Sequence, residues 1–290
     1  MINGKTLITL TEIVLPWPIW SQGGGRTYPY GFYAFVAYTL IGIVYVFVMI
    51  IIGYLFLRAS TALKAKKFYL LGLSFLLVGV FDALHIIGHA LFFLFNDSRT
   101  PIRLDGAILY LYPLTTSFAV SVIILYFTLL YVFGAMETKR KLVLIDKAVI
   151  LMGIIGIILA LNPYNWWHMI PPKNAINTIP GTGGIIFLSG LAAIYSLYTY
   201  YRDLTSRISG DPISEIKLKL FLIGITTLAI MILLIIPHAL LSRAKLYTSL
   251  FIVTTLKLVL LAISAINFYL SLIAPATTIM RILRKDITKQ

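Results

Sequence analysis

Long apolar runs alternate with short polar connections along almost the whole chain. A helix needs about 20 mainly apolar residues to cross the hydrocarbon core of a bilayer. Seven runs fit this pattern, at residues 32–57, 68–95, 107–134, 148–161, 184–201, 218–241 and 248–272, and the fourth is the shortest. The pattern predicts an all-α fold, an integral membrane bundle of seven transmembrane helices.

The segments outside these runs are short. Residues 1–31 contain an apolar stretch interrupted by Thr9, Thr11 and Glu12 and followed by Trp17 and Trp20. It is too short and too interrupted to span a bilayer or to act as a signal core, so we expect an extracytoplasmic, interfacial segment. Residues 32–273 form the predicted transmembrane domain, and 274–290 a basic cytoplasmic tail.

Composition supports a multi-pass protein of the cell membrane, with the lipid bilayer as its surroundings. Of the 290 residues, 60% are hydrophobic and only 12% are charged, whereas soluble domains carry about 25% charged residues. The absence of cysteine excludes disulfides and thiolate chemistry. The net charge of +14 lies between apolar runs, where it indicates membrane topology and no nucleic-acid partner.

The basic residues predict the orientation of the helices, because cytoplasmic connections are enriched in Lys and Arg. One set of connections carries Arg58, Lys64, Lys66, Lys67, Lys139, Arg140, Lys141, Lys147, Arg202, Arg207, Lys217, Lys219, Arg281, Arg284, Lys285 and Lys289. The other set carries fewer than half as many, namely Lys5, Arg26, Arg99, Arg103, Lys173, Arg243 and Lys245. We therefore expect the N-terminus outside and the C-terminus in the cytoplasm.

Apart from Lys219 at the edge of the sixth run, five ionisable residues lie inside the predicted spans: Asp82, His85, His89, His238 and Lys257. Such residues are costly in a membrane and commonly have a function. The three in the second span fall within about 60° on one helical face. Measured from the span midpoints, Asp82 lies near the midplane, His85 and Lys257 about 5 Å outward, and His89 and His238 about 11 and 13 Å outward.

These depths predict a polar chamber in the outer half of the bundle. Tyr112 and Thr116, early in the third span, would add hydroxyl groups to it. Trp166 and Trp167 follow the fourth span and could form a lid. They could equally be interfacial belt residues.

Simpler structural roles also fit the polar residues. Asp82 and Lys257 could be a buried ion pair that fixes helix packing. The histidines could bridge helices through hydrogen bonds, or lie at the membrane interface in the case of His238.

The same residues permit several kinds of chemistry. His85, His89 and His238 have the composition of a zinc or copper site, since residues i and i+4 meet on one helix surface. Two histidines from different helices could also bind haem b. With Asp82, the histidines could form an intramembrane zinc hydrolase of the ceramidase and adiponectin-receptor type. Lys257 could carry a retinal Schiff base with Asp82 as counter-ion.

Two stretches resemble a known family. They are Gly72-Leu-Ser-Phe-Leu-Leu-Val-Gly-Val-Phe-Asp82-Ala-Leu-His85 and Lys257-Leu-Val-Leu-Leu-Ala-Ile-Ser-Ala-Ile-Asn-Phe-Tyr-Leu. They resemble the third class of seven-helix membrane-associated sensor domains, found in prokaryotic histidine kinases and diguanylate cyclases. The resemblance implies ligand-binding roles for Asp82, His85 and Lys257 and accounts for Lys257 without retinal. This chain lacks the acidic residue in span one and the arginine in span three that family members tend to carry.

The function expected from these features is that of a receptor-like or sensor-like protein that binds a small-molecule ligand or metal in the outer half of the bundle. The family's members usually continue into an output domain, whereas about 17 residues follow span seven here. We therefore expect signalling through a cytoplasmic partner or a homodimer. The zinc hydrolase and the haem protein remain the alternatives, and a transporter has little support because no repeated halves are evident.

Overall fold

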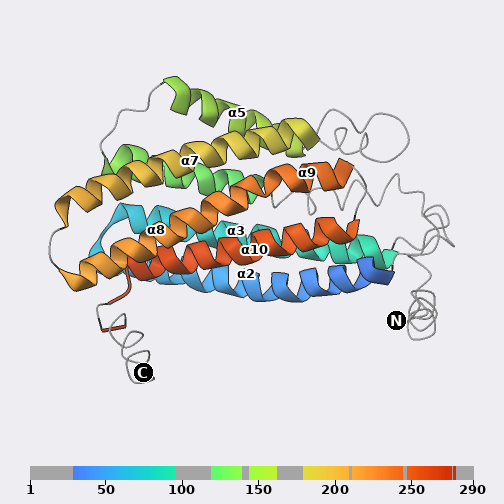
Figure 1. Ribbon diagram of the computed structural model, residues 1–290, viewed down its shortest axis with the longest axis horizontal. Coiled ribbons are helices and arrows are strands. Elements are labelled where there is room, and N and C mark those ends of the chain that lie inside the picture. Colours follow the sequence, from blue (N-terminus) through green and yellow to red (C-terminus); the bar gives the residue numbers. More distant parts are fainter. Residues whose placement is uncertain are drawn as a thin grey trace, which may run out of the picture.

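The protein is a bundle of helices. The computed structural model describes residues 29–95, 119–138, 144–161, 179–208, 211–243, 247–275 and 277–278, and all regular structure within them is helical. The elements are α2 (Pro29–Leu63), α3 (Lys66–Phe95), the helix Ala119–Glu137 with its π-helical end η2 (Leu130–Glu137), α5 (Leu144–Leu161), α7 (Ile179–Arg207), α8 (Pro212–Leu233), α9 (Ile235–Arg243) and α10 (Tyr247–Leu272). The long helices lie side by side, with their axes along the length of the bundle (Figure 1).

Six helices in the described part of the chain are long and apolar enough to cross a membrane. They are Val36–Leu63, Lys66–Ile87, Ala119–Glu137, Gly184–Arg207, Pro212–His238 and Phe251–Leu272. They support a multi-pass membrane protein with a lipid bilayer around it. The seventh span and the orientation of the termini stay predictions.

The fourth predicted span corresponds to α5, which is not among the six. Its first turns carry Asp146 and Lys147, so the apolar part is shorter than the about 20 residues of a typical crossing. The helix lies at the edge of the bundle against α7 (Figure 1). It also approaches the third span, where Gly153 faces the ring of Phe127.

Helices α2 and α3 form a closely packed hairpin. Only Lys64 and Ala65 separate them, and Lys64 has a left-handed backbone with φ of 51°, as residues just after a helix often do. At the crossing, a Cβ atom added to Gly72 would lie 2.9 Å from the carbonyl oxygen of Gly53. A Cβ atom added to Gly53 would lie at the same distance from the carbonyl oxygen of Gly72. Only glycine at both positions lets the backbones approach this closely.

The predicted run 218–241 forms two helices. Asp211 caps the start of α8 by accepting hydrogen bonds from the backbone N–H groups of Ile213 and Ser214, and α8 ends at a turn at Leu234. Pro237 lies just beyond the turn and has no N–H to donate to the carbonyl of Leu233, four residues earlier, which interrupts the helical ladder. The predicted run therefore contains a turn at Leu234, and Pro212–His238 is still one candidate span.

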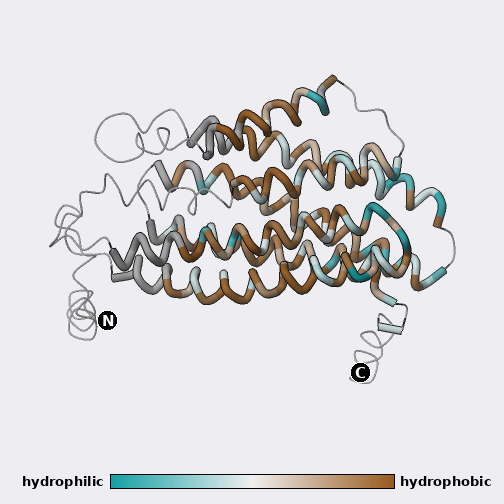
Figure 2. Tube along the Cα trace, turned by 180° about the vertical axis from the view of Figure 1, so that it is seen from behind, coloured by the Kyte–Doolittle hydropathy of each residue, from teal (hydrophilic) through white to brown (hydrophobic). Residues whose placement is uncertain are grey.

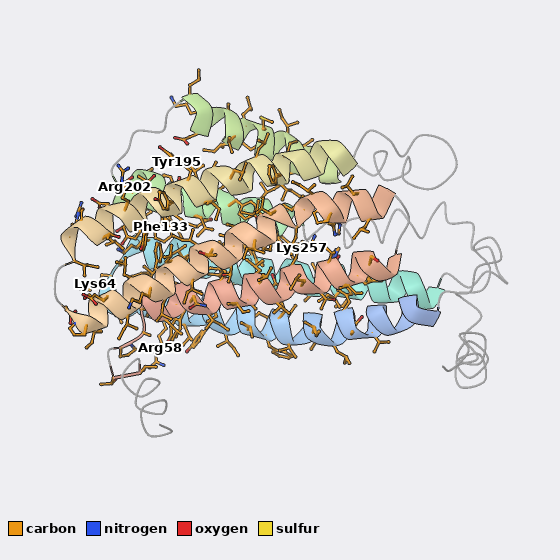
Figure 3. All side chains as sticks on the ribbon, viewed as in Figure 1. Arg58, Lys64, Phe133, Tyr195, Arg202 and Lys257 are labelled. Atoms are coloured by element: carbon orange, nitrogen blue, oxygen red, sulfur yellow. The ribbon has the colours of Figure 1, made fainter. Side chains whose placement is uncertain are left out.

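Polar residues gather at one end of the bundle, where α2 meets α3 and α7 meets α8 (Figure 2). Arg58, Lys64 and Arg202 lie at this end (Figure 3). The Lys67 amine pairs there with Glu137 at 3.1 Å. This is the end that the basic residues predict to be cytoplasmic, and we call it the charged end.

Candidate functional site

Asp82 is buried where three helices meet. Its side chain lies on α3 and is 1% exposed. The hydroxyl of Tyr45, on α2, donates to Oδ2 at 2.5 Å. The hydroxyl of Ser121, on the third span, donates to Oδ1 at 3.2 Å. Both carboxyl oxygens therefore accept a hydrogen bond inside an apolar bundle.

Lys257 lies on α10 (Figure 3) and is 4% exposed. Its Nζ atom is 3.1 Å from Nδ1 of His238, on α9. The hydroxyl of Thr254, one helical turn before Lys257, is 3.2 Å from the same nitrogen. Lys257 and Asp82 also attract each other electrostatically.

These residues form two hydrogen-bonded groups, one of Tyr45, Asp82 and Ser121 and the other of His238, Thr254 and Lys257. The opposite charges of Asp82 and Lys257 act between the groups, and together we call the six residues the buried polar cluster. It joins α2, α3, the third span, α9 and α10. Ionisable groups at such depth cost several kcal/mol unless they are paired and hydrogen-bonded. The hydroxyls and the opposite charges offset this cost.

The contact between Lys257 and His238 constrains their protonation. An ammonium group has only donors, so a charged Lys257 must donate to Nδ1, and the neutral ring then carries its proton on Nε2. A proton added at Nδ1 would remove the acceptor and place two positive charges about 3 Å apart. The two residues can therefore be in contact with at most one of them charged.

The structure brings together three of the predicted site residues, Asp82, His238 and Lys257. His85 lies one turn beyond Asp82 on α3 and is half-buried. The side chain of His89 lies outside the described residues, as do Tyr112, Thr116, Trp166 and Trp167. The outer chamber and its lid therefore stay predictions.

Metal and haem binding also stay predictions. Among the residues that the structure describes, no three His, Asp or Glu side chains are close enough together to hold a metal ion. The proposed set needs His89, whose side chain is not among them. Nδ1 of His238 contacts Lys257 and Thr254, so coordination through that atom would have to displace both.

Sequence reasoning did not identify Tyr45, Ser121 and Thr254 as members of this site. Hydroxyl residues are common in membrane helices and usually bond within their own helix, as Thr255 does to the carbonyl of Phe251. Thr254 lies three residues before Lys257, so helical spacing could have pointed to it. Nothing in the sequence pairs Tyr45 or Ser121 with Asp82, since those contacts join different helices.

No family model matches the chain, and comparison with curated proteins and with solved structures likewise finds no match.

Proposed function

We propose that this chain is a sensor-like membrane protein in which a ligand or a proton acts on the buried polar cluster. The observation that carries the proposal is the 3.1 Å contact between Lys257 and His238, close to the carboxyl group of Asp82. Its output would pass to a cytoplasmic partner or to a second copy of the chain. The resemblance of the stretches around Asp82 and Lys257 to the membrane-associated sensor domains agrees with this role.

The cluster has the properties that a switch needs. A signal can shift a protein between two arrangements only if it interacts differently with each. Protonation of His238 would do so, because it opposes the contact with Lys257 but leaves Asp82 available as a partner. The break at Leu234 would let α9 move with His238 while α8 keeps its packing.

The experiment measures distances between spin labels while His238 is titrated. The chain has no cysteine, so two cysteines introduce labels at defined positions. Leu40→Cys on α2 and Leu240→Cys on α9 are suitable because both side chains are exposed. In lipid nanodiscs, the pH is lowered from about 8 to about 5, the range in which histidine side chains commonly gain a proton, and we expect the distance to shift by about 1–2 Å or its distribution to broaden.

Matched controls separate this effect from a general response to acid. His238→Gln should abolish the change, whereas His85→Gln should retain it. A label pair within the α2–α3 hairpin, Leu40→Cys with Ile87→Cys, should be insensitive to pH, because close packing holds these two helices together. A distance that is constant with pH, or one that changes equally in the His238→Gln variant, would contradict the proposal.

A further inference from the structure

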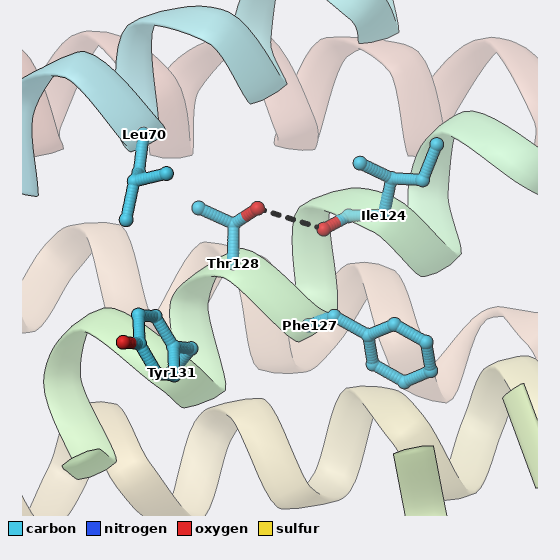
Figure 4. A pocket seen from close by; sticks show the side chains of 5 residues that line it. All are labelled: Leu70, Ile124, Phe127, Thr128 and Tyr131. Carbon is cyan, nitrogen blue, oxygen red and sulfur yellow. Dashed lines mark hydrogen bonds between the residues drawn. The ribbon is translucent and has the colours of Figure 1, made fainter. Parts of the chain in front are cut away.

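A shallow groove of about 230 Å³ lies on the outside of the bundle, between α3 and the third span (Figure 4). It is lined by Leu70, Ile124, Phe127, Thr128 and Tyr131. The hydroxyl of Thr128 donates to the carbonyl of Ile124 in its own helix at 3.0 Å, so it needs no partner from the groove. The surface offered to the surroundings is therefore mostly apolar, and both helices are among the candidate spans.

Basic residues lie at the end of this groove. Lys67, on α3, pairs with Glu137 at the end of the third span, so the ion pair bridges the two helices that line the groove. Leu70 is one turn further into the span than Lys67. Lys66 is exposed and lies four residues before Leu70, on the same face of α3.

We propose that this groove binds an anionic phospholipid, with one acyl chain along the apolar groove and the headgroup against Lys66. The apolar groove matches the acyl chain of such a lipid. The lysine matches its headgroup, because basic residues at helix ends on the cytoplasmic side attract anionic headgroups. Glu137 would oppose an anion, but Lys67 neutralises it. This lipid site is separate from the buried polar cluster and does not depend on the proposed sensor function.

A second copy of the chain fits the groove less well. The charged end carries exposed Arg58, Lys64, Lys66, Arg202 and Lys219, and the whole chain has a net charge of +14. A parallel copy would bring the same basic residues to the same level of the membrane, where they repel. The charge at this end therefore favours an anionic occupant.

Native mass spectrometry of the full chain in detergent tests the proposal by titration with phosphatidylglycerol and with phosphatidylcholine. We expect phosphatidylglycerol to bind more tightly. Lys66→Gln should weaken its binding about fivefold, the ordinary contribution of one lysine at an anionic surface, without affecting phosphatidylcholine. Thr128→Trp, which fills the groove, should weaken the binding of both lipids.

Two control variants introduce the same side chains, Gln and Trp, elsewhere on the bundle. Lys219→Gln and Ile223→Trp alter exposed positions on α8 and should leave the binding of both lipids as in the wild type. Equal effects of Lys66→Gln and Lys219→Gln would overturn the headgroup site. Unchanged binding in Thr128→Trp, or a dimer that this variant disrupts, would overturn the lipid groove.

Discussion

The hydroxyl of Tyr45 donates a 2.5 Å hydrogen bond to Oδ2 of Asp82, and both side chains are almost completely buried. This bond joins α2 to α3 at a second place, beyond the close approach of Gly53 and Gly72. A phenol there supplies a hydrogen-bond donor without adding a second negative charge.

Removing the Tyr45 hydroxyl should destabilise the protein. In Tyr45→Phe, Asp82 keeps the hydrogen bond from Ser121 but loses the donor to its other oxygen. We expect a loss of about 2 kcal/mol in the free energy of unfolding, the usual contribution of a hydrogen bond to a charged group. Unfolding in mixed detergent measures it, with Tyr54→Phe on the exposed face of α2 as the control. Equal effects of the two substitutions would show that the bond contributes nothing.

Asp82 and Lys257 should depend on each other. Lys257→Met leaves the buried carboxyl group without its opposite charge and should cost about 3–5 kcal/mol, more than the double substitution Asp82→Asn/Lys257→Met. Unfolding of the two single variants and the double variant completes a mutant cycle. If the losses simply add, the two residues are not coupled.

The crossing of α2 and α3 should tolerate no side chain. Gly72→Ala would place a Cβ atom 2.8 Å from the backbone nitrogen of Leu57, so the helices must separate, and we expect a loss of about 1–3 kcal/mol. Gly184→Ala is the control, because nothing lies within 4 Å of its added Cβ. That substitution should be neutral or slightly stabilising, since alanine favours helix. Thermal unfolding in the same detergent compares the two variants, and similar melting temperatures would argue against close packing at Gly72.

The start of α8 should respond to acid. The Ser214 hydroxyl, together with the backbone N–H groups of Ser214 and Ile213, donates to Asp211 and holds its pKa below the ordinary value. A lowered pKa in the folded state stabilises the protein above about pH 4, the ordinary range of aspartate, and this contribution is lost as the pH falls through the lowered pKa. Asp211→Asn keeps the cap but does not titrate. The wild type should therefore unfold at a higher temperature than the variant at pH 7, and the difference should shrink toward pH 3. A pH-independent difference would contradict this prediction.

The sequence predicted much of the helical architecture, because apolar runs of this length identify membrane helices with little help from tertiary contacts. Breaks within a helix and the exact length of a short helix were harder to predict from the sequence. Pro237 stands in the printed sequence, yet proline also occurs in continuous membrane helices, so the break at Leu234 had no certain signal. The case of α5 is similar, since Asp146 and Lys147 come directly before the shortest of the apolar runs.

The candidate site likewise contains some residues that the sequence identified and others that it did not. Asp82, His238 and Lys257 are conspicuous because charged or ionisable residues are rare in apolar segments. Tyr45 and Ser121 are ordinary in a membrane helix, and only the arrangement of the helices brings them to Asp82. The groove at Leu70 and Tyr131 depends on the spacing between two helices, and the sequence of a single helix does not show that spacing.

The short connection at Lys64 and Ala65 has a consequence for the order in which the protein assembles. Contacts between residues close in sequence form quickly, because little chain entropy is lost in closing the loop. Gly53 and Gly72 are 19 residues apart in the chain, whereas Tyr45 and Asp82 are 37 residues apart. We expect α2 and α3 to enter the bilayer first and to form their contacts in order, starting next to their connection. The later helices would then assemble on this early nucleus.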